Sequence, residues 1–455
     1  MPLTQNISGP SGQMYAEQKI TPDETKFTRD NTSAAYYNST YYSLHKTQVQ
    51  AIPPPRKDAN TGQPPVVSLK DFLPTQVLTD INRAKKISFH ATGDTGAAKV
   101  NARQTVGTAL SHQAAVADAM AKDVQAGGAA APAFFFHLGD VIYNFGEGQY
   151  YYDQFYEPYR DYDRPIFAIP GNHDGMVFGQ GSTAPQFPTL DAFLTNFCSP
   201  AAGPSPDGGG LVRSAMTQPG VYFTLDAPFV SIIGLYSNVL DGPGVLSSQN
   251  GHFPIVNDQL TFLTSELTRL KPKRQSGERA VILALHHPPL SADAKHGGST
   301  GELQDIDSCC KKANFWPDVV LSGHAHLYQR FTRAHPNGKQ APYVVCGAGG
   351  FAATPPRGGA VAAPVTVGDH TLEVAPIVEF GYLTVTTDAK TLTITFKSVA
   401  PGGAPVEKDT VTLDLQSGTL TAGGHGAPPK HKPGKAAPAG GRRAKPPARG
   451  RRGKP

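Results

Sequence analysis

Between residues 86 and 326, short apolar runs repeatedly end in a side chain that can bind a metal ion. The five runs are KISFHATGD (86–94), AFFFHLGD (133–140), PIFAIPGNHD (165–174), RAVILALHH (279–287) and DVVLSGHAH (318–326). Helix-like stretches separate several of them, as at 102–125, at 149–162, which is rich in aromatic residues, and at 258–270. Runs of this length and composition predict strands, and their alternation with helices predicts an α/β fold.

Three further segments predict β-hairpins, namely 221–237, 328–347 and 382–399. The second contains Asn337 and Gly338, a residue pair that favours tight turns. Hairpins joined to strand–helix units predict two mixed β-sheets packed face to face, with helices outside. Glycine (48) and proline (41) make up about a fifth of the 455 residues, and this excludes a coiled coil or an all-helical bundle.

The composition divides the chain into three expected parts. Residues 1–84 are polar, rich in proline and without periodicity, so they predict an irregular N-terminal extension. Residues 85–420 carry the strand and helix pattern of one large domain. Residues 421–455 hold ten of the 41 basic residues and no acidic residue, which leaves 31 basic against 36 acidic residues elsewhere. This last part has no large apolar residue to bury, so we expect a disordered basic tail.

The ends of the chain and its apolar runs also bear on location. The N-terminal sequence lacks a basic segment followed by an apolar one, so no secretory signal is visible. No uninterrupted apolar run reaches the roughly 18 residues that a membrane-spanning helix needs. The sequence therefore predicts no membrane span and, by default, a cytoplasmic location.

Polar residues at the strand ends form one candidate site. In an open α/β sheet, functional side chains gather at the carboxyl ends of the strands. Two carboxylates, one carboxamide and three imidazoles brought to one edge make a mixed oxygen and nitrogen ligand set for two first-row metal ions. The candidate ligands are Asp94, Asp140, Asn172, His286, His324 and His326.

The order of these motifs, GD, GDxxY, GNHD, H and GHxH, resembles the calcineurin-like metallophosphoesterase superfamily. Within it the chain is most similar to the purple acid phosphatases of the small, single-domain type. The wider superfamily usually has Asp-x-His in the first motif, whereas here Gly96 stands in the place of the histidine. Tyr143, three residues after Asp140, offers a phenolate instead, and hard anionic oxygens suit Fe(III). The resemblance implies a sandwich of two mixed β-sheets flanked by helices, with 85–420 as the catalytic domain.

The resemblance also implies a role for each site residue. Fe(III) would be held by Asp94, Asp140, Tyr143 and His326. Asp140 would bridge to a divalent ion, Fe(II), Zn(II) or Mn(II), that is also held by Asn172, His286 and His324. Two further histidines, His173 and His296, would contact the phosphate or protonate the leaving group. His296 is one residue further from His286 than we would expect, so an exposed loop histidine stays open for it.

The implied function is a binuclear metal-dependent acid phosphatase that hydrolyses small phosphomonoesters by attack of a metal-bound hydroxide. A trivalent ion keeps such a nucleophile available at low pH, which predicts an acid optimum. The alternative within enzymes is a divalent-metal phosphodiesterase or a nucleotide-hydrolysing metallophosphoesterase. A non-catalytic binding protein is disfavoured, because every ligand position is filled.

The basic tail allows a different class of function. Residues 421–455 could contact nucleic acid or an acidic surface. They contain no aromatic residue to stack on bases, so a solvated tail is the favoured interpretation.

Overall fold

The structure is a computed structural model that describes residues 27–57, 64–96, 106–128, 130–143, 145–176, 189–211 and 216–423. All of them belong to one compact unit, residues 1–423. Residues 424–455, most of the predicted basic tail, lie outside the described residues, as do residues 1–26 of the predicted extension. Within the described ranges no helix is long and apolar enough to cross a membrane.

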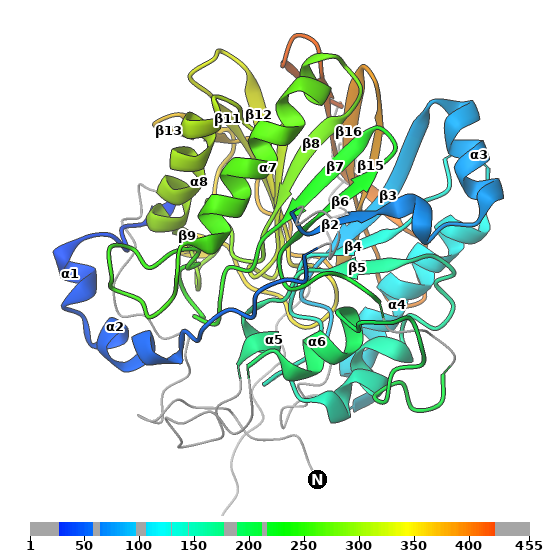
Figure 1. Ribbon diagram of the computed structural model, residues 1–455, viewed down its shortest axis with the longest axis horizontal. Helices are drawn as coiled ribbons and strands as arrows, with labels where there is room; N and C mark the ends of the chain where they lie inside the picture. Colours follow the sequence, from blue (N-terminus) through cyan, green and yellow to red (C-terminus); the bar gives the residue numbers. More distant parts are fainter. Residues whose placement is uncertain are drawn as a thin grey trace, which may run out of the picture. The chain divides into compact units, whose positions relative to one another are not determined.

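The first of the two large sheets has seven strands in the order β18-β17-β16-β15-β3-β4-β5 (Figure 1). Its strands β3, β4 and β5 are mutually parallel, and the remaining four continue the sheet in antiparallel fashion. The strands are β3 (Lys86–Thr92), β4 (Phe135–His137), β5 (Ile166–Ala168), β15 (Gly381–Asp388), β16 (Thr391–Ser398), β17 (Val406–Asp414) and β18 (Leu420–Ala422).

The second sheet has nine strands in the order β13-β14-β11-β12-β10-β8-β7-β6-β2. Strands β7, β8, β10 and β12 are mutually parallel, and β6 and β11 pair antiparallel with the outer two of them, β7 and β12. A separate short pair joins β1 (Thr28–Arg29) to β9 (Gly298–Ser299). The nine strands are β2 (Val66–Ser68), β6 (Phe223–Ala227), β7 (Val230–Gly234), β8 (Ala280–Ala284), β10 (Val319–Ser322), β11 (Tyr328–Ala334), β12 (Gln340–Cys346), β13 (Val365–Val367) and β14 (His370–Leu372).

The two sheets face each other across an apolar interior. Alternate residues of β3, such as Phe89, lie in the same buried cluster as Ile282 of β8 and Leu321 of β10. On the antiparallel side Ile394 and Phe396 of β16 join that cluster, in the two-residue period of a strand. Because one continuous core contains side chains of both sheets, the predicted sandwich of two mixed sheets is confirmed.

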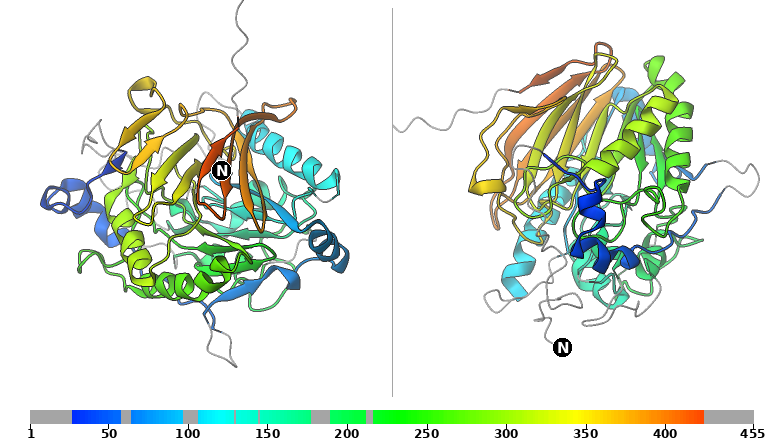
Figure 2. Two further views of the ribbon diagram at one scale, coloured as in Figure 1. Left: turned by 90° about the horizontal axis from the view of Figure 1, so that it is seen from above. Right: turned by 90° about the vertical axis from the view of Figure 1, so that its left-hand side faces the viewer.

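Helices cover the outer faces of both sheets. Leu263 and Leu267 of α7 pack with Ile306 of α8 against the outer side of β8, and Met120 of α4 packs in the same cluster as Phe135 of β4. Figure 2 shows α7 and α8 as a layer outside the nine-stranded sheet. The helices are α1 (Ala34–Tyr37), α2 (Thr40–His45), α3 (Thr75–Ala84), α4 (Val106–Gln125), α5 (Asn172–Gly175), α6 (Asp191–Phe197), α7 (Asp258–Gln275) and α8 (Thr300–Ala313).

Short helical turns connect the larger elements. They are η1 (Lys46–Gln48), η2 (Leu69–Asp71), η3 (Gly148–Tyr150), η5 (Arg357–Gly359) and the π-helical turn η4 (Tyr152–Tyr156). The sequence had predicted one aromatic helix from residue 149 to 162, but only η3 and η4 form there. The π-turn directs the buried side chain of Gln154 onto the backbone of Tyr143, where it both donates and accepts a hydrogen bond of 2.7 Å. Residues 149–162 therefore do not form one continuous α-helix, and Gln154 contacts Tyr143 next to the candidate site.

All three predicted hairpins are present, as β6–β7, β11–β12 and β15–β16. The expected irregular extension, 1–84, is partly regular in its described residues. Its strand β2 pairs with β6 at the edge of the nine-stranded sheet, and α3 leads directly into β3. The strand β2 could not be recognised in the sequence, because it has only three residues and directly follows two prolines. The division of the chain at residues 84 and 420 stays a prediction.

Candidate metal centre

The candidate ligands lie in loops that follow strands of both sheets. Asp94 follows β3, Asp140 follows β4 and Asn172 begins α5 just after β5, whereas His286, His324 and His326 come after β8 and β10. Asp94, Asp140 and His324 have positive φ angles of 59°, 54° and 66°. Non-glycine residues rarely adopt this conformation, and it persists where the surrounding structure fixes it, often at functional sites.

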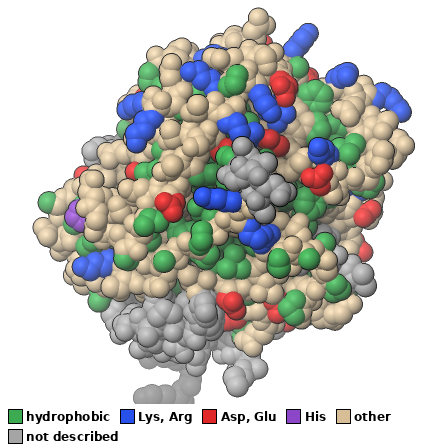
Figure 3. All heavy atoms as spheres, in the orientation of Figure 1, with side chains coloured by type: hydrophobic (Ala, Val, Ile, Leu, Met, Phe, Trp, Pro, Cys, Tyr) green, Lys and Arg blue, Asp and Glu red, His purple; other side chains and the backbone are tan. Residues whose placement is uncertain are grey.

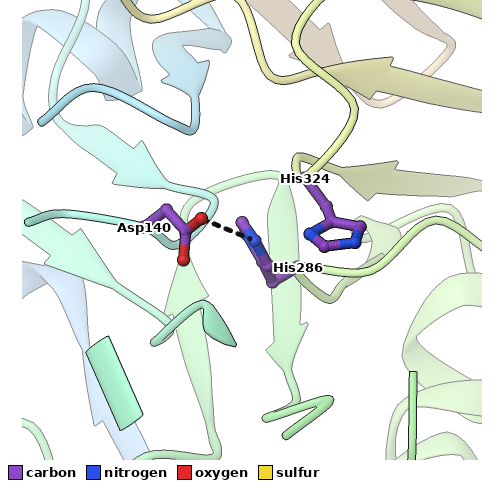
Figure 4. A group of neighbouring side chains, drawn as sticks. All are labelled: Asp140, His286 and His324. Carbon is purple, nitrogen blue, oxygen red and sulfur yellow. Dashed lines mark ion pairs between the residues drawn. The ribbon is translucent and has the colours of Figure 1, made fainter. Parts of the chain in front are cut away.

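One half of the centre consists of Asp140, Asn172, His286 and His324. The Nε2 atom of His286 lies 3.3 Å from Asp140 Oδ2 and 3.1 Å from Asn172 Oδ1. His324 Nδ1 lies 3.0 Å from the same Asn172 oxygen. Figure 4 shows Asp140, His286 and His324 pointing toward one another, and all three side chains are buried. Four potential ligands therefore meet at one place.

Hydrogen bonding outside this group prepares His286 to act as a ligand. Its Nδ1 lies 2.8 Å from the carbonyl oxygen of Leu138, so Nδ1 carries a proton and Nε2 faces the oxygens of Asp140 and Asn172. Among the described residues, the buried atoms Asn172 Nδ2 and His324 Nε2 have no hydrogen-bond partner. Oxygen and nitrogen donors that converge in this way fit a metal cation between them.

The other half of the centre surrounds Asp94. The hydroxyl of Tyr143 lies 3.2 Å from Asp94 Oδ1, and His326 Nε2 lies 3.3 Å from the same oxygen. Asp94 Oδ2 accepts a hydrogen bond of 2.8 Å from the backbone N–H of His324. The Tyr143 ring is stacked on Phe351, with 3.5 Å between the ring centroids. Three of the four side chains expected around a ferric ion, Asp94, Tyr143 and His326, are thus brought together.

The space beside Tyr143 leaves no room for a side chain at Gly96. A Cβ atom on Gly96 would overlap the side-chain oxygen of Gln154 and lie 2.9 Å from both Tyr143 Cδ2 and the Val141 carbonyl oxygen. A histidine at position 96, as in the wider superfamily pattern, would therefore need space that Gln154 and the Tyr143 ring fill in this structure.

Charges in the centre shift the pKa values of its members in opposite directions. Burial opposes ionisation of Asp140, but His286 and His173 outweigh it and hold its pKa well below the ordinary range. Burial likewise opposes protonation of His286, yet Asp140 and Asp94 raise its pKa to about 9. Burial, Asp140 and Asp94 together raise the pKa of Tyr143 well above 10, so its phenolate requires a nearby cation.

The two further histidines of the sequence analysis also reach the centre. The backbone N–H of His173 donates to Asp140 Oδ1 at 2.9 Å, and its ring centroid lies 4.3 Å from that of Tyr143. His296 is only 2% exposed, and its ring centroid lies 4.2 Å from that of His324. The open possibility of an exposed loop histidine at 296 is therefore wrong.

Sequence reasoning missed two buried carboxylates beside the centre. Asp174 accepts hydrogen bonds from the N–H groups of Gly171, Val141 and Ile142, and so ties two ligand loops together. Burial and the charge of Asp140 raise its pKa to about 7. The sequence signal that could have identified Asp174 is its position as the last residue of the GNHD motif. Asp241, in the loop after β7, forms a second group with His296 and His324, and no motif marks it.

The chain matches one protein family and is similar to several solved structures. Residues 87–328 match the model of the calcineurin-like phosphoesterase family. Similar solved structures include the Plasmodium protein GAP50, the anchor in the inner membrane complex (13% identity, TM-score 0.46, 71% of this chain and 87% of that one). PhoD is similar at 14% identity (TM-score 0.46, 75% and 72%), and a dimetal phosphatase from Danio rerio at 12% (TM-score 0.41, 70% and 98%). No curated protein sequence matches significantly.

Proposed function

Because the chain belongs to the calcineurin-like phosphoesterase family, whose members hydrolyse phosphoesters with bound metal ions, we propose that it is an acid phosphatase of the purple acid phosphatase type. Its substrates are small phosphomonoesters. Its cofactors are Fe(III) and one divalent ion, Fe(II), Zn(II) or Mn(II).

One observation carries the finer part of this proposal. The Tyr143 hydroxyl lies 3.2 Å from Asp94, and the Tyr143 ring occupies the volume that a side chain at position 96 would need. A phenolate next to a carboxylate is a hard anionic donor pair, which favours a ferric ion over a second divalent ion. The proposal assigns Asp94, Asp140, Tyr143 and His326 to Fe(III), and Asp140, Asn172, His286 and His324 to the divalent ion.

The protein's own residues orient the reaction. When bound, the metal ions supply charge neutralisation for the phosphate and activation of water. His173 and His296 are placed to give a proton to the leaving-group oxygen, one from the Tyr143 side and one from the His324 side. The side chains of Asp94, Asp140 and Asn172 are buried, so they do not face bulk solvent.

A visible absorption spectrum with metal analysis tests the assignment. We expect a tyrosinate-to-iron colour that is lost in Tyr143→Phe and kept in Tyr151→Phe. Tyr151 is a matched control, because it is also fully buried and its hydroxyl has no hydrogen-bond partner. A colourless protein with two divalent ions per chain would contradict the ferric site.

Substrate comparison tests the reaction class. We expect faster turnover of an aryl phosphomonoester than of the matching diester, with an optimum below pH 7. Asp140→Ala should abolish the activity, since Asp140 is common to both halves of the centre. Preference for the diester, or an optimum well above pH 7, would favour the divalent-metal phosphodiesterase or nucleotide-hydrolysing alternative.

A further inference from the structure

The loop before α8 is built around one buried carboxylate, Asp293. Asp293 is fully buried and accepts a hydrogen bond of 2.8 Å from the hydroxyl of Ser291. It also accepts from the backbone N–H groups of Lys295 (2.9 Å), His296 (2.7 Å) and Gly297 (2.8 Å). Charge-assisted hydrogen bonds of this kind are strong, so four of them hold the loop in one conformation.

The imidazole of His296 lies between two carboxylates. Its Nδ1 is 3.3 Å from Asp293 Oδ2, and its Nε2 is 3.8 Å from Asp241 Oδ1. One face of the ring packs on His324, and the side chain is 2% exposed. The two ring nitrogens therefore have distinct surroundings: Nδ1 faces the loop that carries the histidine, and Nε2 faces the group that includes His324 and Asp241.

The N-terminal segment holds the same loop from outside. The carbonyl of Phe27 accepts a hydrogen bond of 2.9 Å from the N–H of Ser291, and β1 pairs with β9. The guanidinium of Arg29 donates to the carbonyl of Lys295 and lies where a side chain at Gly297 would have to go. The backbone that carries His296 is therefore held by Asp293 within its own loop and by β1 and Arg29 from the N-terminal segment.

We propose that Asp293 is a positioning residue for His296. It holds the imidazole with Nδ1 beside the Asp293 carboxylate and Nε2 directed toward the metal centre. From there the imidazolium form gives its Nε2 proton to the leaving-group oxygen and is left as the neutral Nδ1–H tautomer. This inference rests on the proposed function for the reaction, but the orientation of the ring depends only on contacts within the chain. Among the described residues Nδ1 has no partner in hydrogen-bonding geometry, and the Asp293 carboxylate at 3.3 Å is an ion-pair contact. Its negative charge favours a proton on Nδ1, the ring nitrogen that faces it.

Kinetics with two leaving groups test the proposal in the metal-loaded protein. 4-Nitrophenolate leaves readily without a proton, whereas phenolate depends on proton donation. We expect Asp293→Asn to lower kcat for phenyl phosphate about 10–100-fold, with a much smaller loss for 4-nitrophenyl phosphate and little change in KM. Asp226→Asn is the control, because this partly buried carboxylate binds Ser231 and Arg269 away from the centre. An equal loss for both substrates would overturn the positioning role.

A double variant separates positioning from folding of the loop. If Asp293 acts through His296, Asp293→Asn causes no further loss for phenyl phosphate in a His296→Asn background. If the loss is as large as in the native background, Asp293 supports only the loop, and the inference is wrong.

Histidine side-chain NMR on the metal-free protein gives a readout that needs no activity. The His296 signals are those missing in His296→Asn. We expect the Nδ1–H tautomer in the native protein and its loss in Asp293→Asn. Unchanged ring signals in Asp293→Asn would overturn the inference whatever the substrate. A native protein that hydrolyses no monoester but shows this tautomer change would instead contradict the proposed function and leave the positioning of the ring supported.

Discussion

At the scale of single residues, the proposed ferric site depends on the pair Gly96 and Tyr143. The Tyr143 backbone is held by Gln154 through two hydrogen bonds of 2.7 Å, and its ring is held by Phe351. These contacts leave no space for a Cβ at position 96. A side chain at position 96 is therefore incompatible with the present positions of Gln154 and of the Tyr143 ring.

Gly96→Ala should therefore disturb Tyr143. The added methyl group overlaps Gln154 and must displace it or the Tyr143 ring, and overpacking of this kind costs about 1–3 kcal/mol. We expect that loss in the free energy of unfolding from urea titration, together with a weaker tyrosinate-to-iron absorption. Gly203→Ala is the control, since a Cβ there meets nothing within 4 Å. Unchanged stability and colour would show that the pocket can adapt.

Asp174→Asn should weaken metal binding without removing a proposed ligand. The Asp174 carboxylate accepts from three backbone N–H groups that hold the loops of Asp140 and Asn172. An amide leaves one of these donors facing an NH₂ group, so both ligands lose their orientation. We expect a fall of about 10–100-fold in metal affinity, measured by competition with a chelator. Asp191→Asn, in the exposed first turn of α6, should keep the native affinity.

The proposed ligands other than Tyr143 could be picked out from the sequence, because each stands two to four residues after a strand whose end the local sequence marks. Asp94 and Asp140 come two residues or more after their strands and still point to the same edge. Asp241 could not be predicted, because it stands seven residues beyond the end of β7. The path of that loop depends on packing against the segment around His296, which no local pattern encodes.

At the scale of elements, one buried cluster connects the two sheets through their apolar interior. Asp409 of β17 accepts from the Tyr328 hydroxyl (2.7 Å) and from Arg330 Nε (2.6 Å) and Nη2 (3.1 Å), both on β11. All three side chains are buried. Polar groups in such a place are satisfied only in one alignment of the sheets, so the cluster opposes sliding of one sheet over the other.

Asp409→Asn tests the role of this cluster. Removing one charge leaves Arg330 buried without its counterion, and such changes cost about 3–5 kcal/mol. We expect that loss in the free energy of unfolding, with an unchanged kcat at a temperature where the variant is folded. The control is Lys408→Ala, which breaks the exposed pair with Glu379 and should cost no more than about 1 kcal/mol. Similar losses for the two variants would contradict the role of the buried cluster.

The predicted elements were those with strong local signals. The three hairpins carry alternating apolar residues on both sides of a turn, and β3, β8 and β10 are short apolar runs. β17 went unpredicted, because only the second half of Val406–Asp414 alternates and its first half is polar and exposed. The π-turn η4 was missed because aromatic spacing alone does not distinguish it from an α-helix.

At the scale of the whole molecule, long-range pairings complete what local patterns begin. Val66 of β2 pairs with Thr224 of β6, and Thr28 of β1 pairs with Gly298 of β9. Residues this far apart in sequence meet only when the sandwich has formed, so the part of the described chain before residue 85 could not be placed from its sequence. In this part of the chain, β2 pairs with the edge of the nine-stranded sheet, and β1 pairs with β9 beside the loop that carries His296.

Charge is also distributed unevenly over the chain. The formal charge of +5 combines ten basic residues after residue 423 with a remainder of 31 basic and 36 acidic residues. On the face shown in Figure 3, Lys and Arg side chains lie mostly in the upper half, among uncharged and a few acidic ones.

Removal of residues 424–455 should therefore separate catalysis from any binding of nucleic acid. Every described strand, helix and proposed ligand lies before residue 424, so we expect unchanged kcat/KM for an aryl phosphate and an unchanged free energy of unfolding. The net charge becomes about −5, because the segment has ten basic residues and no acidic one. Any binding to nucleic acid that weakens with salt should disappear with the segment, since such binding depends on the number of cationic contacts. A fall in kcat/KM of tenfold or more would show that the basic segment takes part in the reaction.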